Sequence, residues 1–320
     1  MGREYVTQEK TVDLINDQIA SILICVIHVM SFKVASYVVI TPVRDEEAHL
    51  ASTIESMLRQ TALPREWVIV DDGSTDGTAK IVDDYAARHP WIKAVHRPDR
   101  GFRKSGGGVV EAFYEGYDAL AVNEWDFIVK FDGDLSFEPT YFEECLGEFD
   151  RDSKLGIGGG VICYAEDGHK VVETSPSFHV RGATKIYRRA CWNGIGGLIH
   201  APGWDTFDEV KANSLDWTTR SFPAVHLVHH RVTGAADGHW RTSTKYGRAN
   251  YICGYHPLFM MVKCIARLPQ RPFILGSMGL LYGFCSGYLT RVQQVDDRQT
   301  IAYLRRQQMR RLFGRDTILR

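Results

Sequence analysis

The stretch Val70-Asp71-Asp72-Gly73-Ser74-Thr75-Asp76-Gly77-Thr78 decides the fold of this chain. It follows an apolar, β-branched run at 67–70, which predicts a strand, and it precedes 78–88, where the residue spacing predicts a helix. The glycine, serine and aspartate between them predict a tight turn, with Ser74 or Asp76 capping the helix. The stretch therefore indicates one strand–turn–helix unit.

The same strand–helix pattern continues on both sides of this unit. Upstream, a β-branched run at 37–41 is followed by helical spacing at 46–60. Downstream, strands are predicted at 92–96 and 125–131, with a helix at 109–121 between them. This alternation predicts an α/β fold with a mainly parallel central sheet flanked by helices, and with ligands bound at the carboxyl ends of the strands.

Acidic loops follow three of the predicted strands. Segment 41–47 follows the first, and Asp71 and Asp72 follow the second, where a turn alone does not explain two adjacent carboxylates that repel each other. After the last strand, Asp132 and Asp134 stand two residues apart with glycine between them, so both can bind one hard divalent cation such as Mg2+ or Mn2+. Such a cation neutralises charge on a nucleoside diphosphate leaving group.

In this order and spacing, the segments 41–47, 70–78 and 132–134 resemble the family 2 inverting glycosyltransferases, from Tyr37 to roughly Thr233. The resemblance implies a GT-A fold of the nucleotide-diphospho-sugar transferase superfamily. It also implies an enzyme that transfers a sugar from a nucleotide sugar, with a UDP-sugar as the expected donor and Mg2+ or Mn2+ as the cofactor.

The resemblance further implies roles for individual residues. Asp72 would accept a hydrogen bond from a uracil-like base, and Asp134 would bind the metal. The expected donor-binding residues are Thr41, Pro42, Val43, Arg44, Glu47, Asp71, Asp72, Lys104, Asp132 and Gly133. The expected metal-binding residues are Asp134, Asp132, His229 and His230, where either histidine could instead be structural. Lys104 could instead lie in a solvated loop that does not contact the donor.

An inverting transfer needs one general base to take the proton of the acceptor hydroxyl. The family keeps this base in an acidic pair after the sheet, usually Glu-Asp, whereas the matching segment here, 203–211, reads Asp208-Glu209. We therefore expect the base to be Asp208, then Glu209, then Asp205. If Asp208 opens a helix, it could serve as the helix cap instead.

Composition excludes several other classes of protein. A formal charge of -1 over 320 residues offers no basic field for nucleic acid, and the seven cysteines form no C-x-x-C pair. The first strand is not followed by the G-x-G-x-x-G of dinucleotide-binding enzymes, and the glycines at 106–108 do not begin a P-loop. A catalytically silent, nucleotide-sugar-binding subunit of a polysaccharide assembly complex is the alternative, although the retained acidic residues favour chemistry.

The pattern divides the chain into an extension at 1–36, a GT-A domain at 37–235 and a helical, membrane-associating region at 236–320. The uncharged stretch 272–289 could be an interfacial or re-entrant membrane helix, a membrane span or a buried core helix. The arginine-rich end at 298–320 suits an anionic membrane surface, or is simply solvated. We expect a peripheral protein, or one with a single C-terminal hydrophobic segment, at the cytoplasmic face of a membrane. It would act on a lipid-linked or glycan acceptor in envelope or exopolysaccharide synthesis.

Overall fold

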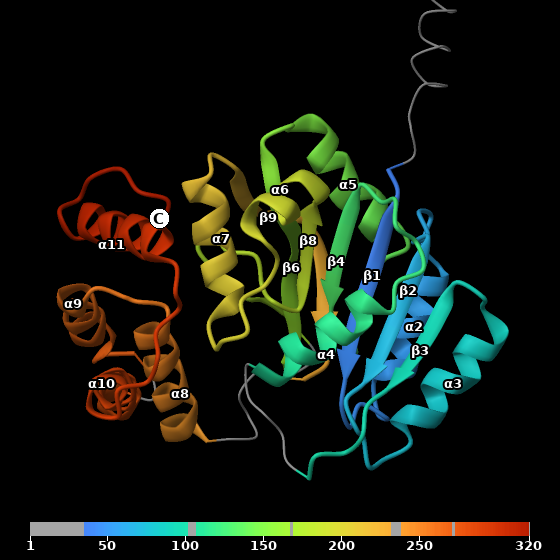
Figure 1. Cartoon of the computed structure of the whole chain (residues 1–320), viewed down its shortest axis with the longest axis horizontal. Helices are drawn as coiled ribbons and strands as arrows, with labels where there is room; N and C mark the ends of the chain where they lie inside the picture. The colour runs from blue at the N-terminus through green and yellow to red at the C-terminus, as the bar shows by residue number, and fades with distance from the viewer. Residues whose placement is uncertain (1–34, 102–106, 167–168, 232–237, 271–272, 320) are drawn as a thin grey trace, which may run out of the picture. The chain divides into compact units, whose positions relative to one another are not determined.

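The computed structural model describes residues 35–101, 107–166, 169–231, 238–270 and 273–319 (Figure 1). Residues 36–320 form one compact unit. The predicted N-terminal extension falls almost entirely outside the described residues, and Lys104 lies outside them as well.

The first half of the sheet is parallel, as predicted. Its strands, in spatial order, are β3 (Ile92–His96), β2 (Glu66–Asp71), β1 (Tyr37–Val43) and β4 (Phe127–Phe131). The helices α2 (Leu50–Leu58), α3 (Thr78–Arg88) and α4 (Gly107–Asp118) connect them. Every residue of β2 and β4 is buried, which is the pattern of a sheet covered on both faces.

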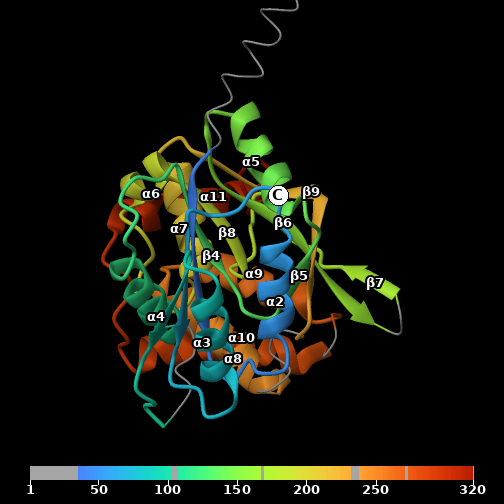
Figure 2. The ribbon, with the colours of Figure 1, turned by 90° about the vertical axis from the view of Figure 1, so that its right-hand side faces the viewer.

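The second half of the sheet is mixed, so the prediction of a mainly parallel sheet is wrong there. Its strands are β8 (Thr184–Arg188), β6 (Leu155–Glu166), β9 (Thr218–His229) and β5 (Leu135–Phe137), with β7 (His169–Val172) paired to β6 alone. Only β6 and β9 are parallel among these pairs. Two residues separate β6 from β7 in the chain, and such a short connection requires antiparallel pairing. Figure 2 shows this pair extending away from the rest of the sheet.

Helices cover both faces of the sheet. One core cluster joins α4 to α6 (Arg189–Ile195) and α7 (Trp204–Ser214) over the strands β1 and β2. On the other face, α5 (Tyr141–Arg151) packs through Phe142, whose ring lies 4.9 Å from that of Tyr37 in β1. Asp208 does not open its helix, because α7 begins four residues earlier, at Trp204.

In the described part of the chain, four further helices follow the sheet, in the region that the sequence predicted to be helical. They are α8 (His239–Ile252), α9 (Pro257–Arg267), α10 (Phe273–Leu289) and α11 (Arg298–Leu312). In Figure 1, α9 and α10 lie at the left edge, separated from the sheet by α7 and α8. Among the described helices, none has the length and apolar character that crossing a membrane requires.

Candidate active site

Two aspartates and a histidine meet where β4 and β9 end. Asp132 and Asp134 follow β4, and the register of β9 places His229 opposite Leu135, the residue after Asp134. One ligand atom from each of the three side chains lies within 4.8 Å of the others. The His229 Nε2 lies 3.1 Å from the Asp134 carboxylate, and both residues are buried. Residues nearly a hundred positions apart in the chain thus form one candidate metal centre.

A threonine from α2 fixes the turn that carries the two aspartates. The Thr53 hydroxyl donates to the carbonyl of Gly133 at 2.8 Å and accepts from the backbone N–H of Leu135 at 2.9 Å. A Cβ atom at Gly133 would lie 2.5 Å from Val43 Cγ1, so a larger residue would push the turn away from β1. Thr53 escaped the sequence analysis, because nothing in a helical pattern marks a residue that bonds to a distant loop.

The neighbouring histidine is outside this cluster. Successive residues of a strand point to opposite sides, so His229 and His230 diverge at the end of β9. His230 Nε2 lies 2.6 Å from the Ser136 hydroxyl, and its ring stacks on that of His49 at 5.3 Å. Of the two predicted histidines, the structure therefore brings only His229 to the aspartates.

Charges around the cluster keep the Asp134 carboxylate ionised. Burial alone would raise the pKa of Asp134, but the hydrogen bond from His229 and the charges of His229, Arg231 and Lys130 lower it below the usual value. Lys130, buried on β4, forms an ion pair with Asp132. Lys130 and Arg231 were not predicted as part of the site, because a lysine in a strand and an arginine after one are common where no ligand binds.

The donor set fits a hard or borderline divalent ion. Two carboxylates and one imidazole suit Mn2+, and the carboxylates alone suit Mg2+. Among the residues that the structure describes, the buried Nδ1 atom of His229 has no hydrogen-bond partner, so the ring has unused bonding capacity. The residues present therefore match the cofactor that the sequence predicted.

The two aspartates at the end of β2 have different roles. Asp71 closes the turn, since its carboxylate accepts from the Ser74 N–H at 2.9 Å. Asp72 forms ion pairs with Arg97, at 2.6 Å, and with Arg100. Asp72 is thus held by two arginines at the carboxyl edge of the sheet, and neither arginine was predicted.

The loop after β1 braces the loop after β2. Glu47 accepts from the Gly77 N–H at 3.0 Å, and Arg44 donates to the carbonyl of Asp72 at 2.7 Å. Thr41 is fully buried and accepts from the indole N–H of Trp67 at 2.9 Å. The Thr41 side chain thus lies inside the sheet, because β1 continues through Thr41 and Pro42 to Val43.

Both members of the predicted acidic pair are bonded inside the protein. Asp208 accepts from the Lys185 ammonium at 2.8 Å and from the Tyr187 hydroxyl at 2.6 Å. Glu209 is completely buried and accepts from the Val180 N–H at 2.7 Å. This arrangement exposes neither carboxylate to an acceptor. It therefore argues against ranking Asp208 and Glu209 ahead of Asp205 as the general base.

Asp205 is the remaining acid of this segment, and it is partly exposed in the first turn of α7. A Cβ atom at Gly182 would lie 3.3 Å from the Asp205 Cβ, so the two residues are neighbours. The next residue, Ala183, accepts a hydrogen bond from the Asp132 N–H at 2.9 Å. Asp205 therefore lies next to the Gly182–Ala183 backbone that bonds to Asp132, whereas Asp208 lies one turn further along α7 and is buried.

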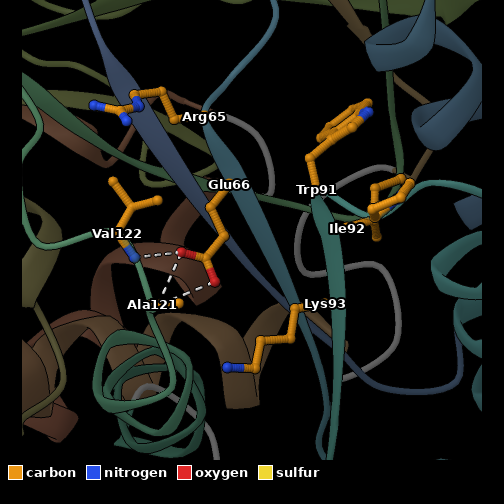
Figure 3. A pocket seen from close by; sticks show the side chains of 8 residues that line it. Arg65, Glu66, Trp91, Ile92, Lys93, Ala121 and Val122 are labelled. Atoms are coloured by element: carbon orange, nitrogen blue, oxygen red, sulfur yellow. Dashed lines mark hydrogen bonds between the residues drawn. The ribbon is translucent and has the colours of Figure 1, made fainter.

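A separate shallow pocket lies at the other end of the strands. Figure 3 shows that Glu66, at the start of β2, accepts from the backbone N–H groups of Ala121 and Val122 there. Trp91 and Lys93, at the start of β3, form its other side. This pocket is at the amino ends of the strands, away from the acidic loops, and we assign it no role in the chemistry.

Comparison with known proteins identifies the family. Residues 38–202, half of the chain, match the glycosyl transferase family 2 sequence profile. The chain belongs to glycosyl transferase family 2. The resemblance predicted from the sequence is thereby confirmed, and so is the presence of a glycosyltransferase domain.

The named relatives align with this chain over only part of their length. Chondroitin synthase of Escherichia coli is 31% identical over 33% of this chain and 14% of the synthase. The uncharacterized glycosyltransferase EpsJ of Bacillus subtilis is 32% identical over 40% of this chain and 35% of EpsJ. The chain thus spans much less than two thirds of these relatives.

Solved structures support the GT-A type of fold. GalNAc-T7, solved with UDP, GalNAc and Mn2+, gives a TM-score of 0.54 at 14% identity, covering 82% of this chain and 56% of that one. The mannosyltransferase PcManGT of Pyrobaculum calidifontis, solved with GDP-Man and Mn2+, gives 0.50 at 15% identity, covering 88% of each chain. At these low sequence identities, both similarities support the fold alone.

Proposed function

We propose that this protein is an inverting glycosyltransferase that moves a sugar from a nucleotide-diphospho-sugar, with a UDP-sugar as the favoured donor, to an acceptor hydroxyl. The observation that carries the proposal is the cluster of Asp132, Asp134 and His229 at the strand ends of a family 2 domain. The Mn2+ and nucleotide ligands of GalNAc-T7 and PcManGT agree with this reading.

The chain's own residues would bind and orient the donor. Asp134 and His229, with Asp132 beside them, would hold a Mg2+ or Mn2+ ion, which when bound neutralises the charge that develops on the diphosphate. Asp72 would receive the nucleotide base at the end of β2, where Arg97 and Arg100 keep its carboxylate in place. Thr53 keeps the aspartate turn from moving during this step.

Asp205 would act as the general base. Its carboxylate would take the proton of the acceptor hydroxyl while the oxygen of that hydroxyl attacks the anomeric carbon from the side opposite the leaving nucleotide. The support for this role is its partial exposure beside Gly182 and Ala183, which border the candidate metal centre. Lys185 and Asp208, buried below, would hold the start of α7 in position.

We further propose that the acceptor is lipid-linked or a growing glycan, and that the protein works at the cytoplasmic face of a membrane in envelope or exopolysaccharide synthesis. The support is the partial similarity to chondroitin synthase and to EpsJ. The basic segment at 298–320 is compatible with an anionic membrane surface.

A panel of nucleotide sugars tested for Mn2+-dependent hydrolysis by the purified protein examines this function. We expect turnover of one donor class, loss of that turnover in Asp134→Ala, and no change in Asp84→Ala, an exposed aspartate of α3. Tight binding of a nucleotide sugar with no hydrolysis and no transfer would instead favour the catalytically silent subunit.

A further inference from the structure

An apolar surface on α9 and α10 has no partner in the described part of the chain. It contains Met261 and Ile265 of α9, the C-cap residue Leu268 of that helix, and Ile274, Met278 and Leu281 of α10, and we call it the apolar face. In each helix the three residues recur at i, i+4 and i+7, so they lie along one side. Their side chains are 40–60% exposed, which is unusual for six large apolar groups on two helices in contact.

Packing on the opposite side of α10 fixes this orientation. A Cβ atom at Gly283 would lie 2.0 Å from the carbonyl oxygen of Thr244 in α8, and one at Gly279 would lie 2.9 Å from Ser243 Cβ. The glycines therefore let the two helices touch through their backbones. Because the side of α10 that carries small residues faces α8, the side that carries large apolar residues faces outward.

The charge around the apolar face has one sign. Between His239 and Val295 the sequence contains seven lysines and arginines and no aspartate or glutamate. Arg241, Lys245 and Arg248 recur at i, i+4 and i+7 on α8 and are exposed. A polybasic segment of this kind is attracted to the anionic headgroups of a bilayer.

Aromatic side chains with a polar atom accompany these cations. Trp240 of α8 and Tyr282 of α10 lie with their ring centroids 5.8 Å apart, and both are exposed. Indole and phenol rings have an apolar body and a hydrogen-bonding edge, so they collect at the boundary between lipid tails and headgroups.

We propose that the apolar face and the α8 cations dock on the surface of an anionic lipid bilayer. In this arrangement Ile265 and Ile274 enter the acyl boundary, while Arg241 and Arg248 contact lipid phosphates. A second copy of the chain fits the surface less well, since a symmetric contact would bring two acid-free, basic surfaces together. The bilayer supplies both the apolar medium and the opposite charge.

The docking surface is connected to the candidate active site through α8. A Cβ atom at Gly203, the residue before α7, would lie 2.7 Å from Cys253 Sγ and 3.6 Å from Ala249 Cβ. Asp205 follows two residues later. Docking would therefore hold the acceptor side of the site near the membrane, where a lipid-linked acceptor is found. Only this link to the acceptor rests on the proposed function; the docking itself does not.

Vesicle flotation of the whole protein tests the docking. We expect binding to vesicles of phosphatidylcholine with phosphatidylglycerol, and weaker binding to phosphatidylcholine alone or at high salt. The double variant Ile265→Gln/Ile274→Gln should lower the partition coefficient at least about tenfold on both kinds of vesicle. The double variant Arg241→Gln/Arg248→Gln should lower it roughly fivefold for each cation removed, and only on the anionic vesicles.

The control is Leu63→Gln, which replaces an exposed apolar residue outside this region and should leave flotation unchanged. Circular dichroism checks that each variant is folded. The docking is overturned if folded wild-type protein does not float with anionic vesicles, or if Ile265→Gln/Ile274→Gln floats like wild type. It is also overturned if the apolar face instead forms a dimer that this variant dissociates in sedimentation. Donor hydrolysis in the same preparations reports separately on the proposed function, since it needs no lipid.

Discussion

Two regions of the molecule, residues 36–231 and residues 239–289, differ in how far they bury their large apolar side chains. Of the twenty such side chains that are exposed in the described part of the chain, fifteen lie between Trp240 and Leu289. The first region closes its core around a sheet with helices on both faces. The second has a small core, including Met260, Leu280 and Phe284, and leaves the other side of the same helices uncovered. The two regions therefore differ in their surfaces: the first buries most of its large apolar side chains around the sheet, and the second leaves the apolar face exposed.

The largest expected effect concerns the chemistry of the first region. Replacing the proposed general base in Asp205→Asn should lower kcat for sugar transfer by roughly 10²- to 10⁴-fold, with an unchanged melting temperature. Asp208→Asn should instead lower the melting temperature, because it weakens a buried pair with Lys185. Steady-state kinetics and thermal unfolding of both variants check this. The assignment of the base fails if Asp208→Asn loses kcat at normal stability while Asp205→Asn remains active.

The same truncation in the two regions should give unequal losses of stability. Ile128 of β4 is fully buried, so Ile128→Ala should reduce the free energy of unfolding by about 2–5 kcal/mol. Ile265 is 60% exposed, so Ile265→Ala should change it by less than about 0.5 kcal/mol in the absence of lipid. Urea titration of the two variants measures the difference. Equal losses would show that the apolar face is covered in solution, which contradicts the comparison.

A smaller effect is expected where α10 touches α8. Gly283→Ala places a methyl group against the backbone of Thr244, and overpacking of this kind costs about 1–3 kcal/mol. Gly147→Ala, in α5, is the matched control because its Cβ would enter open space. Hydrogen exchange should show faster exchange in α8 and α10 of Gly283→Ala, with unchanged β1 and β4. Equal exchange in the two variants would mean that the glycines do not set the helix contact.

Local patterns were sufficient to predict the parallel half of the fold. The β-branched runs at 37–41 and 67–70 form buried strands, and each is followed by a helix, because hydrophobic periodicity and turn chemistry act within a few residues. The mixed half was not predictable in this way. Its order depends on pairings such as β4 with β8, which join residues far apart in the chain and leave no mark on local spacing.

Some residues of the candidate site could likewise be predicted from local sequence, and others could not. Asp132 and Asp134 could be predicted, because a D-x-D after an apolar strand is a local signal. The choice of His229 over His230 depends on the register between β9 and β5, and the choice of Asp205 over Asp208 depends on where α7 begins. Arg97 and Arg100 reach Asp72 across a loop. Such contacts are decided by tertiary packing, so no spacing rule in one sequence reveals them.

The two adjacent histidines provide the most direct test of the central claim that Asp132, Asp134 and His229 form the metal centre of the transferase. The measurement is the Mn2+ concentration that gives half-maximal donor hydrolysis. We predict that His229→Ala raises this concentration at least about tenfold, as expected for loss of a metal ligand, and that His230→Ala leaves it unchanged. An increase in His230→Ala, or none in His229→Ala, would contradict the account.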